Sequence, residues 1–248
     1  MNRTPPADVR RILRREVGFG CPVCGNPYLT YHHFDPPWCE KEHHNPEGMI
    51  ALCLEHHSKA DVNTYTKEQL RDFKQNGIAH SKEVRGRFDW LRNDLHAVVG
   101  SLYCTNTLDI FTFNRKRVIW FNRDKENYFL LNVQIVSPSG EEMLLIEDND
   151  WIVKGNPIDI ESPPSGKLLN IKYCNDEYLR IEYKEVPSNQ GGGSPLTVVE
   201  VRYKVGNLDF GPGYITAPGI TITNVCLDRC DSGLFLWEQN GRWSIGIG

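Results

Sequence analysis

Residues 21–61 of this 248-residue chain read CPVCGNPYLTYHHFDPPWCEKEHHNPEGMIALCLEHHSKAD. The stretch contains four of the eight cysteines and six of the eight histidines of the chain. Packing so many polar, metal-binding side chains together is costly unless metal ions satisfy them. We therefore expect two metal sites here, one ion that holds a small fold together and one that takes part in chemistry.

Two pairs of ligand-type residues predict the structural site. Cys21 and Cys24 form a Cys-x-x-Cys turn, and Cys53 and His56 form a Cys-x-x-His turn. Each turn can aim two ligands at one point, and two such turns complete the tetrahedron that Zn²⁺ prefers. His57 is an alternative fourth ligand, but His56 keeps the two-residue spacing. The alternative to a zinc site is a group of buried free cysteines.

The other ligand-type residues of the stretch predict a second, catalytic ion. His57 and Asp61 are four residues apart, so they share a face of the helix expected from Leu54 to about Val62. His32 and His33 are adjacent in a short β-type run, so their side chains point to opposite sides. One of them can bind the ion while the other, as a neutral imidazole, takes a proton from water. This division of roles suits hydrolysis of a phosphodiester.

The pattern over about residues 18–65 resembles the HNH (ββα-metal) endonucleases of the zinc-containing type. The resemblance implies that His32, His57 and Asp61 hold the catalytic ion and that His33 is the general base. It also implies a structural Zn²⁺ on the Cys-x-x-Cys and Cys-x-x-His turns. A carboxylate ligand such as Asp61 favours Mg²⁺ or Mn²⁺ as the catalytic ion.

One position departs from the family pattern. The family carries an asparagine that braces the loop between the two β runs, and Gly48 stands at that place here. Because glycine and asparagine both tolerate a left-handed backbone, we expect the loop to keep its shape. Asn45 and the loop histidines His43 and His44 are candidates to replace the brace.

A basic helix is predicted before the metal-binding stretch, from Asp8 to Val17, after a short lead-in of residues 1–7. Its arginines lie opposite an apolar stripe, where they face either solvent or phosphate. The candidate nucleic-acid contacts are Arg10, Arg11, Arg14, Arg15 and Lys59.

The net charge of −4 argues weakly against a nucleic-acid partner. Residues 1–100 carry 14 basic and 13 acidic side chains, however, whereas residues 101–248 carry 14 and 19. The acidic excess therefore belongs to the C-terminal part, and a basic face on the N-terminal part remains compatible with DNA.

The rest of the chain divides into two types of pattern. A helix is expected over residues 65–76, with Thr66 and Gln69 as a capping box, and a further helix over residues 81–99. From residue 102 onward, short runs of β-branched and aromatic residues alternate with turn signals. The predicted fold class is α+β, with a zinc-stabilised ββα-metal nuclease module and flanking helices over residues 1–100. An all-β sandwich or open barrel follows over residues 101–248.

These patterns predict a metal-dependent endonuclease that hydrolyses DNA. A nuclease module joined to a β-rich region suggests, by analogy, a role in restriction or phage defence. The alternative is a non-cleaving, zinc-stabilised module that binds DNA or protein. Residues 101–248 are expected to serve in recognition, in sensing, or in binding a partner protein or a second copy of the chain. The short apolar runs and the lack of a signal-like N-terminus predict a cytoplasmic protein with no membrane partner.

Overall fold

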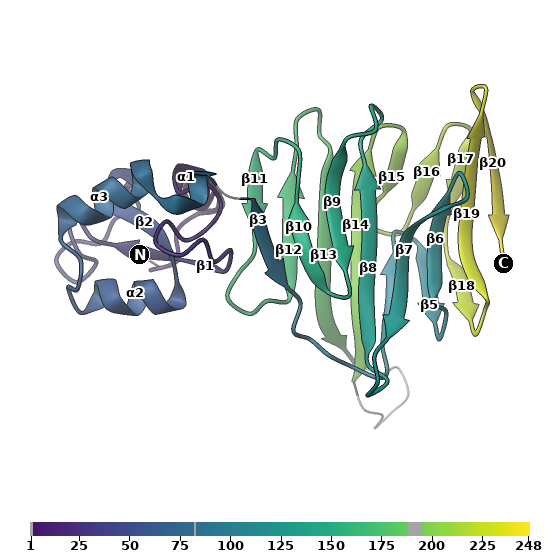
Figure 1. Ribbon diagram of the computed structural model, residues 1–248, viewed down its shortest axis with the longest axis horizontal. Coiled ribbons are helices and arrows are strands. Elements are labelled where there is room, and N and C mark those ends of the chain that lie inside the picture. Colours follow the sequence, from purple (N-terminus) through teal and green to yellow (C-terminus); the bar gives the residue numbers. More distant parts are fainter. Residues whose placement is uncertain (1, 82, 188–194) are drawn as a thin grey trace.

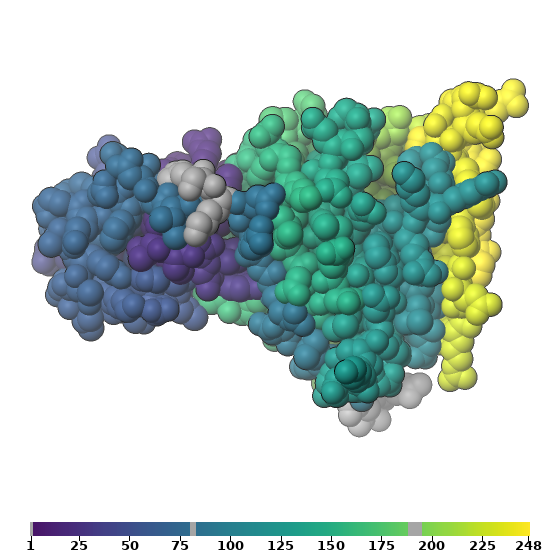
Figure 2. Space-filling view, viewed as in Figure 1, coloured from purple at the N-terminus to yellow at the C-terminus, as the bar shows by residue number. Residues whose placement is uncertain are grey.

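The computed structural model describes residues 2–81, 83–187 and 195–248. Helices and a two-stranded hairpin form an N-terminal region, and two large β-sheets lie beside it (Figure 1). We call residues 2–81 the N-terminal region and the remaining described residues the β region. In the space-filling view the N-terminal region forms a lobe at one side of the β region (Figure 2). The helices of the described residues are too short and too polar to span a lipid bilayer.

The elements of the N-terminal region follow the local sequence signals. Helix α1 buries Leu13 and Val17 on its apolar stripe. Helix α3 begins at the predicted capping box, in which the side chains of Thr66 and Gln69 each accept a hydrogen bond from the other's backbone N–H. The elements of this region are α1 (Ala7–Glu16), β1 (Leu29–His33), β2 (Met49–Cys53), α2 (Leu54–Asp61) and α3 (Lys67–Asn76), with 3-10 turns at Pro46–Gly48 and Ile78–Ser81.

Strands β1 and β2 form an antiparallel hairpin in which His32 is opposite Ile50 and His33 is opposite Met49. Strand β2 is buried along its whole length, and helix α2 follows it without a loop. This hairpin and helices α1, α2 and α3 share a small core that is separate from the core of the β region.

The first large sheet has eight strands in the order β20–β19–β6–β7–β8–β9–β10–β3. Neighbouring strands are antiparallel except β6 and β19, which are parallel. The strands are β3 (Val84–Arg87), β6 (Asp109–Phe113), β7 (Lys116–Arg123), β8 (Phe129–Val136), β9 (Glu142–Glu147), β10 (Asp150–Val153), β19 (Ser232–Gln239) and β20 (Arg242–Ile247).

The second large sheet has ten strands, with β11 to β17 in sequence order and β4 placed beside β14. Strand β4 is parallel to β14 and antiparallel to β5, and β5 is parallel to β18. The strands are β4 (His96–Val99), β5 (Leu102–Thr105), β11 (Asp159–Glu161), β12 (Leu168–Lys172), β13 (Tyr178–Val186), β14 (Leu196–Val205), β15 (Leu208–Phe210), β16 (Ile215–Ala217), β17 (Ile220–Ile222) and β18 (Val225–Asp228).

The two large sheets share one hydrophobic core. Buried and half-buried residues alternate along β13, where Leu179, Ile181 and Tyr183 point inward. Aromatic contacts join the sheets, because Phe111 of β6 lies 4.9 Å from Phe210 of β15, measured between ring centroids.

The predicted α+β fold class is wrong, because 46% of the chain is strand and only 14% is helix, which makes the fold mainly β-sheet. The predicted flanking helix over residues 81–99 is the main error. Strand β3 pairs with β10 and strand β4 pairs with β14 and β5 instead. Pairing with strands distant in sequence overrides the helical spacing of the apolar residues. Strand β3 has room only for glycine at residue 86, because a Cβ atom there would lie 2.4 Å from the ring of Trp151.

The domain boundary after residue 100 stays a prediction. The structure pairs strands β3 and β4, which precede this point, with strands that follow it. Residues 84–99 therefore pack with the β region, and Phe88 and Val99 belong to its core.

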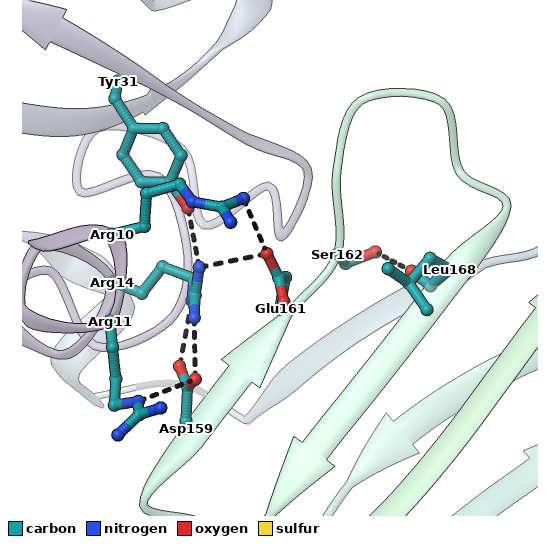
Figure 3. A network of polar contacts seen from close by, with 8 residues as sticks. All are labelled: Arg10, Arg11, Arg14, Tyr31, Asp159, Glu161, Ser162 and Leu168. Atoms are coloured by element: carbon teal, nitrogen blue, oxygen red, sulfur yellow. Dashed lines mark hydrogen bonds and ion pairs between the residues drawn. The ribbon is translucent and has the colours of Figure 1, made fainter. Parts of the chain in front are cut away.

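Ion pairs, one of them buried, join helix α1 to strand β11 (Figure 3). The guanidinium of Arg14 donates to both carboxylate oxygens of Asp159, at 2.9 and 2.7 Å, and also donates to the hydroxyl of Tyr31 at 2.8 Å. Arg10 pairs with Glu161 at 3.1 Å and Arg11 with Asp159 at 3.6 Å. Because Arg14 and Asp159 are only 3% and 2% exposed, the pair is shielded from solvent.

Replacing Arg14 with Met should lower the free energy of unfolding by about 3–5 kcal/mol, because Asp159 loses its bidentate partner inside the protein. Urea unfolding followed by circular dichroism measures the change. Arg15→Met is the matched control, since Arg15 is exposed on the same helix, and it should change the free energy by less than about 0.5 kcal/mol.

The double variant Arg14→Met/Asp159→Leu should regain most of the loss, because it leaves no unpaired buried charge. Equal effects of Arg14→Met and Arg15→Met would show that the buried pair contributes nothing to stability.

Candidate metal centres and the adjoining cleft

Cys21, Cys24, Cys53 and His56 converge on one point and could hold a metal ion such as zinc. The Cys-x-x-His turn lies where strand β2 meets helix α2. Cys53 ends the strand, and His56 lies in the first turn of the helix. Sγ of Cys24 lies 3.8 Å from Sγ of Cys53, and Nδ1 of His56 lies 3.6 and 3.1 Å from the Sγ atoms of Cys21 and Cys53.

These separations fit a tetrahedral zinc site. With Zn–S bonds of about 2.3 Å, neighbouring sulfur ligands are ~3.8 Å apart. Burial raises the pKa of Cys21 to about 12, so without a cation this thiol stays protonated at neutral pH. A bound zinc ion would stabilise the thiolates and displace their protons.

His32, His57 and Asp61 form a second set of ligand-type atoms beside the first. Nδ1 of His32 lies 3.1 Å and Nε2 of His57 lies 3.7 Å from the same carboxylate oxygen of Asp61. Nδ1 of His32 is buried, and its contact with Asp61 lacks the geometry of a good hydrogen bond. Burial lowers the pKa of both histidines, which favours the neutral form that binds metal. The residues therefore fit a divalent ion.

Thr30 orients His57, and the sequence pattern did not single it out. The Thr30 hydroxyl donates its proton to the carbonyl of Leu52 at 2.9 Å and lies 2.6 Å from Nδ1 of His57. Since its single proton is already used, the hydroxyl must accept the hydrogen bond from Nδ1–H. This leaves the lone pair of Nε2 directed at the Asp61 side. The only signal in the sequence is that Thr30 lies two residues before His32, on the same side of the strand.

His33 lies on the other side of β1 from His32. It is buried, and neither of its ring nitrogens has a hydrogen-bond partner among the described residues. Its ring packs 4.7 Å from that of Trp38 and 5.2 Å from that of His43, measured between centroids. Burial, with a further contribution from His43, lowers the pKa of His33 to about 4, so the imidazole is neutral at pH 7.

A cleft of about 240 Å³ joins these groups. His32 and Asp61 of the ligand set line it together with His33, and the basic residues Arg3 and Lys67 lie at its wall. The charge of Arg3 contributes to the lowered pKa of His32, His33 and His57. No sequence pattern pointed to Arg3, because it lies in the segment expected to be a lead-in.

Gly48 closes the loop between the two strands through its backbone. Its carbonyl accepts hydrogen bonds from the N–H groups of Phe34 and Asp35, at 2.9 and 3.1 Å. A Cβ atom at residue 48 would lie 1.9 Å from the carbonyl oxygen of Asp35. The φ angle of Gly48 lies outside the positive range, so a left-handed backbone does not explain why glycine is needed at this position. Close approach of two backbone segments is the reason.

His43 holds the same loop with a side chain. Its Nδ1 accepts a hydrogen bond from the N–H of Asn45 at 3.1 Å, so Nε2 carries the proton and donates to the carbonyl of Pro36 at 2.9 Å. The side chain of Asn45 accepts from the N–H of Glu47 and caps the 3-10 turn. His43 and Asn45, two of the three candidates for a replacement brace, thus bind the loop.

Most of the predicted nucleic-acid contacts have partners within the chain. Arg10, Arg11 and Arg14 face Asp159 and Glu161 of the β region (Figure 3), and Lys59 pairs with Glu55 at 2.6 Å. Arg15 is exposed. The basic residues that line the cleft with His32 and His33 are Arg3 and Lys67, which sequence analysis did not propose.

Comparisons with protein-family models, curated proteins and solved structures found no match to this chain.

Cys24→Ser should remove the bound zinc, because three ligands hold the ion far less tightly than four. The measurement is metal content by mass spectrometry after dialysis, combined with a thermal melt, and we expect one zinc per chain in the unchanged protein. Cys174→Ser is the control, since Cys174 is an exposed thiol of the β region. Zinc retained by Cys24→Ser at the level of the control would contradict the site.

Proposed function

We propose that the chain is a metal-dependent endonuclease of the HNH type that hydrolyses the phosphodiester bonds of DNA. The observation that carries the proposal is the position of His33. A buried histidine whose ring nitrogens make no well-formed hydrogen bond is uncommon, and this one lines a cleft together with His32 and Asp61 of the candidate ligand set. A partner that is absent from the described chain, such as the attacking water, would satisfy it.

Each residue of the cleft has a role in this proposal. His33, neutral at pH 7, takes the proton from the water that attacks phosphorus. A divalent ion such as Mg²⁺ or Mn²⁺, held by His32, His57 and Asp61, would supply charge stabilisation at the phosphate and the leaving 3′ oxygen. Thr30 keeps His57 in the tautomer that leaves Nε2 free for metal.

The charge of the cleft suits an anionic substrate. Arg3 is exposed at the cleft wall and makes a direct phosphate contact in this proposal. Lys67 is held at the same wall by Asp35, with Nζ 2.7 Å from the carboxylate. A phosphodiester in the cleft also adds negative charge near His33, which favours the imidazolium formed after proton transfer.

His33→Ala should reduce the cleavage rate by roughly 10²–10⁴-fold, because the general base is lost while the metal ligands remain. Conversion of supercoiled plasmid in Mg²⁺ or Mn²⁺ measures the rate, and zinc content and circular dichroism check that the fold is intact. His96→Ala, in strand β4, is the matched control and should cleave at the original rate.

EDTA should stop cleavage by the unchanged protein. If the protein binds plasmid but does not cut it with either ion, the alternative of a non-cleaving binding module is correct. Equal cleavage rates for His33→Ala and His96→Ala would exclude His33 as the base.

Arg3→Ala should weaken DNA binding at all sequences and reduce the slope of log affinity against log salt by about 1, because one phosphate contact is lost. Binding is measured by fluorescence anisotropy in Ca²⁺, over a series of salt concentrations. Arg229→Ala, an exposed arginine of the β region, should leave the slope unchanged. The same slope for both variants would show that Arg3 makes no phosphate contact.

A further inference from the structure

A second cavity, separate from the cleft, opens at one end of the two large sheets. Four hairpin turns surround it, those of β6–β7, β8–β9, β14–β15 and β19–β20, which lie at the upper end of the sheets in Figure 1. Its volume is about 710 Å³, which lies in the range of small-molecule sites. We call it the mouth cavity, and its lining includes Phe113, Val118, Tyr203, Leu208, Glu238 and Trp243.

The rim of the mouth cavity is formed by turns from both sheets. Gly206 of the β14–β15 turn approaches Pro138 of the β8–β9 turn so closely that a Cβ atom would lie 2.7 Å from its ring. Asn114 of the β6–β7 turn accepts a hydrogen bond from the backbone N–H of Glu238 at 2.8 Å. These contacts hold the turns against one another, so the opening is shaped before any ligand arrives.

The walls of the mouth cavity are aromatic and aliphatic. Phe113 and Trp243 stack with their ring centroids 5.7 Å apart and their planes 24° apart. Phe111 lies deeper, 6.3 Å from the ring of Tyr203. Flat side chains at these separations offer faces and edges against which a planar ring can pack.

Tyr203 lines the mouth cavity and carries a buried polar group. It is 2% exposed and stacks on Phe210, and its buried hydroxyl has no hydrogen-bond partner among the described residues. Burial raises the pKa of Tyr203 well above its usual value, so the hydroxyl stays protonated and can donate. Buried hydroxyls normally have a partner, and a ligand acceptor would provide one here.

The charge of the lining restricts the class of ligand. Glu238 contributes a carboxylate, and the residues that line the mouth cavity include no lysine, arginine or histidine. A phosphate or carboxylate on the ligand would meet no cation and would face Glu238. Nucleotides are therefore excluded, and the mouth cavity is distinct in chemistry from the phosphate-binding cleft.

We propose that the mouth cavity binds a neutral, planar heteroaromatic molecule. Its ring packs against Phe113, Val118 and Trp243, and its acceptor atom takes the hydrogen bond of the Tyr203 hydroxyl. This gives the β region a small-molecule site of its own.

Three ring compounds of similar size test the proposal with the full-length protein. Quinoline carries a ring acceptor, naphthalene lacks it, and quinoline-2-carboxylate adds a negative charge. Saturation-transfer NMR and titration should show that quinoline binds, that naphthalene binds roughly two- to tenfold more weakly, and that the carboxylate does not bind. Failure of all three compounds to bind, or tightest binding of the carboxylate, would overturn the proposal.

Two variants locate the binding. Tyr203→Phe should reduce the affinity for quinoline to that for naphthalene and leave naphthalene binding unchanged. Val118→Trp should fill the mouth cavity and abolish binding of both, and Leu208→Trp provides a second filling variant if the first does not fold. Quinoline binding that none of these variants alters would place the ligand elsewhere and contradict the proposal.

Discussion

Convergence of Cys21, Cys24, Cys53 and His56 is the constraint on which the N-terminal region depends. The hydrophobic core of this region is small, so an ion held by these four residues would supply much of what joins the hairpin to helix α2. The same constraint sets the geometry of the cleft. His56 and His57 are adjacent on α2, and their side chains diverge by about 100° around the helix axis. Because His56 points toward Cys21 and Cys53, its neighbour His57 points toward His32.

The second constraint is the buried pairing of Arg14 with Asp159, which attaches the N-terminal region to the β region. It also explains how a basic helix and an acidic C-terminal part occur in one chain. The arginines of α1 neutralise acidic groups of β11 instead of forming an open basic face. In the proposed function, contact with a phosphate backbone therefore depends on the few basic groups at the cleft.

Sequence analysis identified features whose chemistry is local. Ligands on one turn or one helix face are spaced by the backbone itself, so the spacing of Cys21 with Cys24, or of His57 with Asp61, indicates shared sites. Features that depend on distant partners were missed. Apolar side chains between residues 84 and 99 have helical spacing, yet the backbone of this segment forms strands that pair with β10 and β14. Arg3, Thr30 and the mouth cavity were likewise invisible, because tertiary folding alone brings their surroundings together.

Gly48 occupies a position at which the structure has no room for a side chain. An asparagine at residue 48 cannot fit, since its Cβ atom would overlap the carbonyl of Asp35. Asp35 in turn binds Lys67 and Arg71 of helix α3. Glycine at residue 48 thus lets the loop approach α3 and keeps Lys67 at the wall of the cleft, while His43 takes over the bracing of the loop. The size of residue 48, the position of the loop and the position of Lys67 therefore depend on one another.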